Sequence, residues 1–308
     1  MSKKVLVATY KPFARDAITG MKEIFGKVGY ELELLEGYTD HNELVEAVKD
    51  VNALIVRSDK INEKVLNAAK ELEIIVRGGA GYDNIDLKLA SEKDIVVMNT
   101  PGQNSNAVAE LAFGMMVYLA RGKFNGKPGT ELKGKTLGIH AYGNVGKNIA
   151  RLAKGFEMDV LAFDPFVDDD LMKQDDVKPV KSEIDLYSQC NYVSLHLPKV
   201  KQTINFINYE LLSKMKENAV LVNTARKEVV DEKSLKKIFA DRDDFKYISD
   251  IAPDCREELE EEYPDRCFFT PKKMGAQTKE ANVNAGLAAA NQIVGYFKEG
   301  KTTFQVNK

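Results

Sequence analysis

The chain has 308 residues, enough for two domains of ordinary size, and 44% of them are apolar, as in a water-soluble globular protein. Its formal net charge of −3 argues against a nucleic acid or an anionic membrane surface as partner, because both are bound through a basic excess. Its three cysteines form neither a metal-spaced pair nor a disulfide framework, which suits a reducing compartment.

The first residues lead directly into a strand-like segment without the apolar stretch of a signal peptide. No later stretch of about 20 apolar residues could cross a membrane. We therefore expect a cytoplasmic protein.

The first hundred residues alternate between short runs rich in valine and isoleucine and charged segments with helical spacing. Strands that alternate with helices predict βαβ crossovers and a parallel sheet. The runs cover residues 4–9, 53–57, 74–77 and 95–99, and the helical segments are Asn42–Lys49 and Asn62–Lys70.

Asn104–Arg121 is apolar on nearly every side, which a helix tolerates only when most of its surface is buried. We expect this helix to lie between two domains. A connection rich in glycine, proline and lysine follows at Gly122–Gly134.

Residues 135–165 predict a strand, a glycine turn, a helix and a second strand. The turn Ala141–Gly146 reads Ala-Tyr-Gly-Asn-Val-Gly. In a dinucleotide-binding unit the middle glycine admits the pyrophosphate, and the helix N-terminus binds it. Asp164 follows Gly146 by 18 residues, near the spacing of about 20 expected of a carboxylate that binds the adenosine ribose. This carboxylate would repel a 2′-phosphate, so NAD is favoured over NADP.

Ala141 replaces the first glycine of this turn, and alanine fits there only if the residue does not need a positive φ. An ordinary strand-to-helix turn is the alternative interpretation.

The rest of the chain predicts a second doubly wound domain, with strands at Asn191–Leu195, Ala219–Asn223 and Lys246–Asp250 and helices that begin near Asn208 and Asp231.

An acidic run from Cys255 to Arg266 is typical of a solvated face. Thr278–Phe297 is predicted to be a helix that returns the chain to the first domain, with Thr303–Val306 as a last edge strand. The fold class is therefore α/β, with a Rossmann-type dinucleotide domain at 102–284 inserted into a flavodoxin-like substrate domain at 1–101 and 285–308.

Several motifs occur in one order along the chain, and together they resemble the D-isomer-specific 2-hydroxyacid dehydrogenase family, most closely its phosphoglycerate dehydrogenases. Members regulated by serine carry further C-terminal domains, which we do not expect here. The motifs are Val56–Ser58, Arg77–Asn84, Asn99–Gly102, Asn104–Ser105 with Ala109–Leu111, His196–Pro198, Asn223–Arg226 with Val229–Asp231, and Lys273–Ala276.

Oxidation of a 2-hydroxy acid needs a base for the hydroxyl proton and a cation for the carboxylate and carbonyl. The resemblance assigns the cation to Arg226, whose planar guanidinium can hold both groups. In most of the family the base is a histidine assisted by a glutamate, but Lys273 and Cys255 occupy those two places. We expect Lys273 to be the acid/base. A lysine base requires burial or cationic neighbours, such as Lys272 and Arg226, to lower its pKa.

The alternative is that Lys273 only attracts an anionic substrate in an impaired or altered enzyme. Asp254 and Glu257 remain open as supporting carboxylates. The three histidines, His41, His140 and His196, are expected to be structural.

The resemblance also implies the binding residues. Arg57 and Arg77 match arginines that contact a substrate phosphate, and two of them suggest the doubly anionic 3-phosphoglycerate. Asp250 is placed to bind the nicotinamide carboxamide. The implied substrate-binding residues are Arg57, Ser58, Arg77, Gly79, Ala80, Gly81 and Asn104. The implied cofactor-binding residues are Tyr142, Gly143, Asn144, Val145, Gly146, Asp164, Pro165, Leu197, Pro198, Thr224, Ala225, Asp250, Gly275 and Ala276.

The implied reaction is the NAD-dependent oxidation of 3-phospho-D-glycerate to 3-phosphohydroxypyruvate, the first step of serine biosynthesis. One alternative is a glyoxylate, hydroxypyruvate or other D-2-hydroxyacid reductase, which would not need Arg57 and Arg77 together. Another is an NAD-sensing, co-repressor-like binding protein, favoured by the missing histidine and glutamate and opposed by Arg226. The family's dimers form through the dinucleotide domain, so we expect a homodimer.

Overall fold

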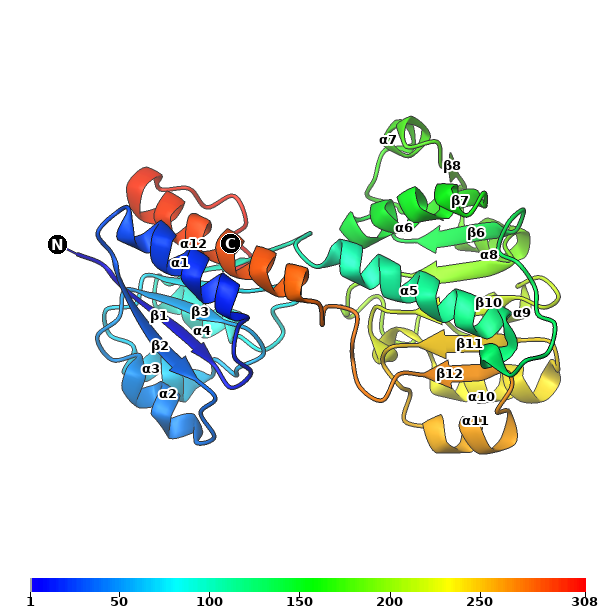
Figure 1. Cartoon of the computed structure of the whole chain (residues 1–308), viewed down its shortest axis with the longest axis horizontal. Coiled ribbons are helices and arrows are strands. Elements are labelled where there is room, and N and C mark those ends of the chain that lie inside the picture. Colours follow the sequence, from blue (N-terminus) through cyan, green and yellow to red (C-terminus); the bar gives the residue numbers. More distant parts are fainter. Residues whose placement is uncertain (1) are drawn as a thin grey trace. The chain divides into compact units, whose positions relative to one another are not determined.

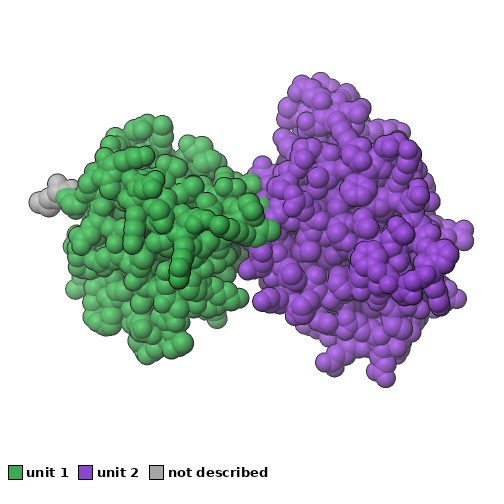
Figure 2. Space-filling model, in the orientation of Figure 1, with its two compact units in different colours: residues 1–104, 278–308 green, residues 105–277 purple. Residues whose placement is uncertain are grey.

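A computed structural model describes residues 2–308, which form two compact units (Figure 2). Unit 1 contains residues 1–104 and 278–308, and unit 2 contains residues 105–277. Each unit is built on one parallel sheet covered by helices, so the predicted fold class is confirmed. Across residues 2–308, no helix is both long and apolar enough to span a membrane.

Unit 1 has a five-stranded sheet in the order β2-β1-β3-β4-β5. This is the flavodoxin-like order, in which the chain reverses direction across the sheet between β1 and β3. Figure 1 labels its strands β1, β2 and β3. The strands are β1 (Lys4–Thr9), β2 (Glu31–Glu36), β3 (Ala53–Val56), β4 (Ile74–Arg77) and β5 (Val96–Asn99). The helices are α1 (Arg15–Gly26), α2 (His41–Ala47), α3 (Glu63–Ala68), α4 (Leu87–Glu92) and α12 (Lys279–Glu299).

Helices α1 and α12 pack closely on one face of this sheet. A Cβ added at Gly286 of α12 would lie 3.2 Å from the Ala17 Cβ of α1, and Ile293 of α12 packs in the same apolar cluster as Val5 and Val7 of β1. The end of the chain therefore completes the core of the unit in which the chain begins.

The predicted edge strand at Thr303–Val306 is wrong. This segment makes a single antiparallel bridge, between Gln305 and Met98, with main-chain hydrogen bonds from Val306 N–H to the Val97 carbonyl at 2.9 Å and from Asn99 N–H to the Phe304 carbonyl at 3.4 Å. The Asn307 side chain adds hydrogen bonds with Val97 N–H and the Ile95 carbonyl, so one bridge and a side chain hold the end of the chain.

Unit 2 has a seven-stranded sheet in the order β12-β11-β10-β9-β6-β7-β8. Read from β8, its first six strands follow the Rossmann order 3-2-1-4-5-6. The strands are β6 (Thr136–His140), β7 (Asp159–Phe163), β8 (Lys178–Pro179), β9 (Tyr192–Leu195), β10 (Val220–Asn223), β11 (Lys246–Ser249) and β12 (Cys267–Phe269). The α-helices are α5 (Ser105–Ala120), α6 (Asn144–Gly155), α7 (Asp169–Gln174), α8 (Glu183–Gln189), α9 (Tyr209–Ser213), α10 (Glu232–Asp241) and α11 (Arg256–Glu262).

The apolar helix α5 belongs to unit 2 and packs against α6, β10 and β11. Its Ala109, Ala112, Phe113 and Met116 are buried in one apolar cluster with Ile139 of β6. Burial on several sides explains why this helix carries almost no polar face.

Candidate active site

The turn between β6 and α6 has the shape expected of a dinucleotide-binding loop. A Cβ at Gly146 would lie 2.6 Å from the Ala141 carbonyl oxygen, so no side chain fits there. A Cβ at Gly143, the residue before α6, would meet nothing within 4 Å, which leaves space beside the helix N-terminus. Because the first N–H groups of a helix have no acceptor within it, this space suits a pyrophosphate.

Ala141 adopts a φ of +79°, the left-handed conformation that glycine provides without strain. The expectation that alanine fits here only without a positive φ is therefore not met, because the position does need a positive φ. An alanine held there costs roughly 1–2 kcal/mol. The loop keeps its glycine geometry although the glycine is absent.

Asp164 lies just after β7, and main-chain N–H groups hold both of its carboxylate oxygens. Its Oδ2 accepts from Tyr142 N–H at 2.8 Å and its Oδ1 from Phe166 N–H at 2.9 Å. The Tyr142 side chain is buried, and its hydroxyl donates to Asp175 at 2.9 Å. Tyr142 therefore offers the turn its backbone, while the lone pairs left on Asp164 could accept hydrogen bonds from ribose hydroxyls.

Two buried acceptors lie just beyond the ends of β10 and β11. Asp250 is fully buried, and its Oδ2 accepts the Gly275 N–H at 2.7 Å. Its Oδ1 and the Thr224 Oγ1 have no hydrogen-bond partner within the described part of the chain. Since buried polar atoms are rarely left unsatisfied, these two atoms mark a place for a ligand with N–H or O–H donors, such as a carboxamide.

Burial raises the pKa of Asp250, and the Gly275 N–H, Lys273, the Met274 N–H and Arg226 oppose that rise. Gly275 is required here, because a Cβ would lie 2.8 Å from the Asp250 Oδ2. The carboxylate is thus held by a close main-chain contact and by the field of two cations.

Arg226 and Lys273 both belong to unit 2, and both act electrostatically on Asp250. Arg226 is partly buried, and its Nη1 donates to the Ala225 carbonyl at 2.9 Å. Asn223 Nδ2 donates to the Arg226 carbonyl at 3.0 Å and fixes this loop. Lys273 is exposed. Burial, one of the two expected ways to lower the pKa of a lysine base, is therefore not provided here.

The open carboxylate candidates lie in other surroundings. Asp254 forms an ion pair with Lys227, and Glu257 is exposed on α11. The backbone N–H of Asp254 and that of Cys255 donate to the two oxygens of Glu232, at 2.6 and 3.2 Å. Cys255, which occupies the place of the family's glutamate, is therefore hydrogen-bonded through its main chain to the first residue of α10.

His140 and His41 have environments that suit structural roles, whereas the buried Nε2 of His196 has no hydrogen-bond partner among residues 2–308. His140 is buried, its Nδ1 lies 3.1 Å from the Tyr187 hydroxyl, and burial lowers its pKa to about 4. Burial and the nearby His140 lower the pKa of His196 to about 3. His41 begins α2 and lies 3.5 Å from Asn62 Oδ1 through its Nε2.

In unit 1, Arg57 and Arg77 meet at the carboxyl ends of β3 and β4. Arg77 Nε donates to the Arg57 carbonyl at 2.9 Å, and Arg77 Nη1 donates to the Gly78 carbonyl at 3.3 Å. Gly79 has a φ of +146°, and a Cβ there would lie 1.6 Å from Arg77 Nη1. Only glycine allows the loop to pass this close to the guanidinium.

The loop after Arg77 and the loop after Arg57 complete this edge. Asn99 Nδ2 donates to the Ala80 carbonyl at 2.7 Å and holds the Gly79–Gly81 loop. Ser58 is exposed, and Asn104 is the last residue of this part of unit 1. The predicted substrate residues Arg57, Arg77 and Ala80 therefore lie at the same edge of the sheet. Arg77 is hydrogen-bonded to Arg57, and Asn99 is hydrogen-bonded to Ala80.

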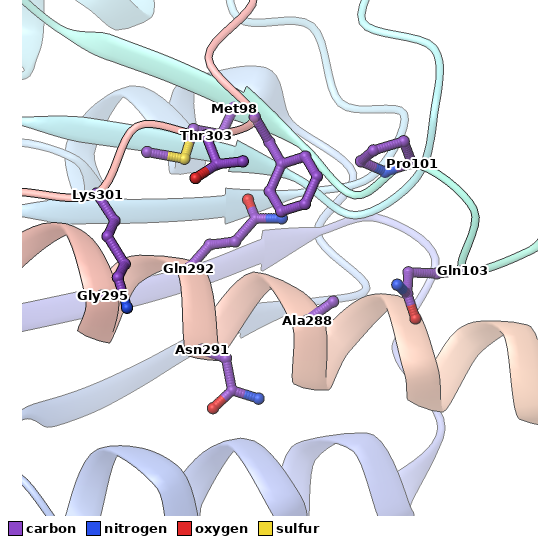
Figure 3. A pocket seen from close by; sticks show the side chains of 10 residues that line it. Met98, Pro101, Gln103, Ala288, Asn291, Gln292, Gly295, Lys301 and Thr303 are labelled. Atoms are coloured by element: carbon purple, nitrogen blue, oxygen red, sulfur yellow. The ribbon is translucent and has the colours of Figure 1, made fainter.

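Two hollows in unit 1 hold few of the predicted residues. One, of about 280 Å³, is lined by α12, by Met98 and Pro101, and by the segment that follows α12 (Figure 3). Another, of about 450 Å³, includes Ser58. Neither of these two hollows is lined by Arg57 or Arg77.

The sequence motifs do not point to Lys11, whose carbonyl accepts a hydrogen bond from Arg57 Nη1 at 3.3 Å. A lysine two residues after a predicted strand was the available signal, but only the strand order places it beside Arg57.

Comparison with known proteins agrees with the fold and with the motifs. Residues 113–264 match the NAD-binding domain of D-isomer specific 2-hydroxyacid dehydrogenases. The D-3-phosphoglycerate dehydrogenase of Archaeoglobus fulgidus is 36% identical over 96% of this chain, which spans 57% of that protein. The hydroxypyruvate reductase of Thermotoga maritima is 36% identical over 87% of the chain and 91% of its own length.

A solved structure of an NAD+-bound 3-phosphoglycerate dehydrogenase from Entamoeba histolytica superposes with a TM-score of 0.91. It is 45% identical and covers 100% of this chain and 99% of its own. By contrast, the chain spans little more than half the length of the archaeal phosphoglycerate dehydrogenases that it matches.

Proposed function

Because this chain belongs to the D-isomer specific 2-hydroxyacid dehydrogenase family, we propose that it oxidises 3-phospho-D-glycerate to 3-phosphohydroxypyruvate with NAD. The observation that carries the proposal is the gathering of Arg226 and Lys273 about the buried Asp250 at the edge of a dinucleotide-type sheet. A fixed cation and an amine supply the charge stabilisation and the base that this oxidation requires, and the unsatisfied acceptor suits its cofactor.

NAD, when bound, accepts the hydride from C2 of the substrate. Asp250 Oδ1 and Thr224 Oγ1 suit the nicotinamide carboxamide, because each is a buried polar atom in need of a partner. Asp164 would accept the ribose hydroxyls, and the space at Gly143 would admit the pyrophosphate. The residues of unit 2 therefore fit this cofactor along its length.

Lys273 would take the proton of the C2 hydroxyl as the carbonyl forms, and it would return that proton in the reverse direction. Arg226 would hold the substrate carboxylate and stabilise the developing charge on the carbonyl oxygen. In unit 1, Arg57 and Arg77 would bind the phosphate, and the N–H groups of the Gly79–Gly81 loop would bind the carboxylate.

The test is an activity screen with NAD across D-2-hydroxy acids with and without a phosphate. We expect kcat/KM for 3-phosphoglycerate to exceed that for D-glycerate by about 100-fold, since a lost hydrogen-bonded charge costs roughly 1.5–3 kcal/mol. Equal values would favour the second candidate, a hydroxypyruvate or glyoxylate reductase, which the Thermotoga relative supports. NAD binding without turnover of any hydroxy acid would favour the NAD-sensing protein.

We also propose a homodimer in a reducing cytoplasm. Tyr118, Phe124 and Phe268 of unit 2 form an aromatic group, and Phe124 is 67% exposed, which suits a protein interface. The cysteines are free, and Cys190 and Cys267 are buried. Light scattering during gel filtration should give twice the chain mass, and a monomer would contradict the dimer.

A further inference from the structure

The strand order of unit 1 singles out the loops after β1 and β3. The chain leaves β1 toward β2 on one side and later returns to β3 on the other, so the sheet order reverses between β1 and β3. Ligands of doubly wound sheets bind at such a reversal, outside the carboxyl ends of the strands. Lys11 lies two residues after β1, and Arg57 directly follows β3.

These two loops contact each other through Arg57. Its Nη1 donates to the carbonyls of Lys11 and Pro12, at 3.3 and 3.5 Å. Its guanidinium carbon lies 5.3 Å from the centre of the Phe13 ring, a cation–π distance. The main chain at Lys11 therefore fixes where the Arg57 guanidinium lies.

The buried carboxylate of Asp59 also connects these two loops. The Oδ1 of Asp59 accepts the Tyr10 N–H at 2.8 Å and the Tyr38 hydroxyl at 2.7 Å, and its Oδ2 accepts the Arg57 N–H at 3.2 Å. Glu36 accepts the Phe13 N–H at 2.9 Å. Both acids at this edge are thus occupied by protein donors.

The Lys11 ammonium lies over the Tyr10 ring, 5.4 Å from its centre, and both residues are exposed. A lysine on an exposed ring keeps its charge and its flexible stem, and it gives up only a weak contact, about 0.5–1 kcal/mol, when it turns to another partner. The Arg57 and Arg77 guanidinium groups, by contrast, are held by main-chain carbonyls.

We propose that Lys11 is a third cation of the phosphate site, which binds the substrate phosphate together with Arg57 and Arg77. The inference rests on the proposed function and sharpens its substrate class to a phosphate monoester. Such a group carries close to two negative charges and three acceptor oxygens at neutral pH, which two fixed guanidinium groups and one mobile ammonium can share. A hydroxy acid without phosphate would leave Lys11 on the Tyr10 ring.

The test uses Lys11→Ala, Lys11→Arg and the control Lys70→Ala. Lys70 is an exposed lysine of the same unit, but it lies between α3 and β4, at the opposite edge of the sheet. Steady-state kinetics with 3-phosphoglycerate and with D-glycerate would be combined with calorimetric titration of 3-phosphoglycerate, which reports binding without turnover.

Lys11→Ala should raise KM and Kd for 3-phosphoglycerate about 10-fold, leave kcat unchanged and leave D-glycerate kinetics unchanged. Lys11→Arg should restore most of the affinity, and Lys70→Ala should behave as wild type. Salt should weaken 3-phosphoglycerate binding less in Lys11→Ala than in wild type, because one charge pair is gone.

Wild-type KM and Kd in Lys11→Ala would overturn the inference and leave the proposed function standing. An equal loss for both substrates would also overturn it, because a merely structural lysine would act on both. Failure of the wild-type protein to bind or oxidise 3-phosphoglycerate would overturn the proposed function together with this phosphate site.

Discussion

The carboxyl edges of the two sheets hold charged groups in opposite ways. In unit 2 the acceptors at the edge are buried and partly unsatisfied, as with Asp250, whose Oδ1 has no partner among residues 2–308. In unit 1 the guanidinium groups of Arg57 and Arg77 are partly exposed and donate to main-chain carbonyls. The same position in a doubly wound sheet thus serves two chemistries.

The difference follows from the ligand that each edge suits. A nicotinamide is neutral and has donors, so it can satisfy buried acceptors and needs a dry pocket. A phosphate and a carboxylate are strongly hydrated anions, so they need cations that solvent can reach. Cofactor binding and proton transfer should therefore depend mainly on unit 2, and phosphate recognition on unit 1.

Apart from Lys273→Ala, the largest effect is expected from Arg226→Ala, which removes the cation from the unit 2 edge. We expect kcat/KM for 3-phosphoglycerate to fall about 1000-fold, as for loss of a preorganised charge at a reacting oxygen. Lys227→Ala is the matched control, because Lys227 forms a surface ion pair with Asp254, and should change kcat/KM less than about 2-fold. A loss below tenfold in Arg226→Ala would remove the arginine from the mechanism.

The next effect concerns stability, and it tests how dry the unit 2 edge is. His140 has a pKa of about 4 when folded, against about 6.5 when unfolded, so the unfolded chain binds more protons between these values. The free energy of unfolding should fall on the order of 3 kcal/mol as pH drops from 6.5 to 4. Chemical denaturation of His140→Phe should lack this part of the fall, whereas His41→Ala should keep it.

Asp250→Asn should separate stability from cofactor binding. The Asn Oδ1 must accept the Gly275 N–H, which leaves a donor facing the carboxamide, so we expect Kd for NAD to rise about 10-fold. Burial raises the Asp250 pKa, so the folded protein holds this proton more tightly than the unfolded chain does. The free energy of unfolding of the wild type therefore falls as pH rises through that pKa and Asp250 becomes charged. Relative to wild type, the variant should therefore gain stability between acidic and neutral pH. Asp254→Asn is the control, and unchanged NAD affinity in Asp250→Asn would contradict the assignment.

Ala141→Gly should have the smallest effect. It relieves roughly 1–2 kcal/mol of strain at φ +79°, but the added freedom of the unfolded chain costs about 0.4–1 kcal/mol, so the net gain in stability lies between zero and about 1.6 kcal/mol. Ala288→Gly, in the interior of α12, should instead lose about 1 kcal/mol. Equal losses in the two variants by thermal unfolding would show that Ala141 is not strained.

Much of the fold could be predicted because its signals are local. Buried parallel strands consist of short apolar runs, and Asn208, Asp231 and Thr278 each cap the helix that was expected to begin beside them. Strand β2 was not predicted, because its sequence Glu-Leu-Glu-Leu-Leu-Glu alternates glutamate with leucine and lacks the continuous apolar run of a buried strand. Such alternation is compatible with its place at the edge of the sheet. The C-terminal segment was mistaken for a strand because the hydrogen bonds of Asn307 are set by tertiary contacts.

The candidate site could be predicted only in part, for a related reason. Motif order found Arg226 and Asp250, but the positive φ of Ala141 and the Lys227–Asp254 ion pair depend on the fold. Lys11 carries no motif, and only the reversal of strand order between β1 and β3 brings it beside Arg57.

The central claim is that Lys273 is the acid/base at the unit 2 edge, and turnover of Lys273→Ala across pH tests it most directly. We predict that kcat falls about 100- to 10,000-fold, that the limb of the pH profile belonging to the base disappears, and that Kd for NAD stays within about 3-fold of wild type. Lys70→Ala, at an exposed lysine of unit 1, should retain wild-type turnover. Wild-type turnover and an unchanged pH profile in Lys273→Ala would contradict the account.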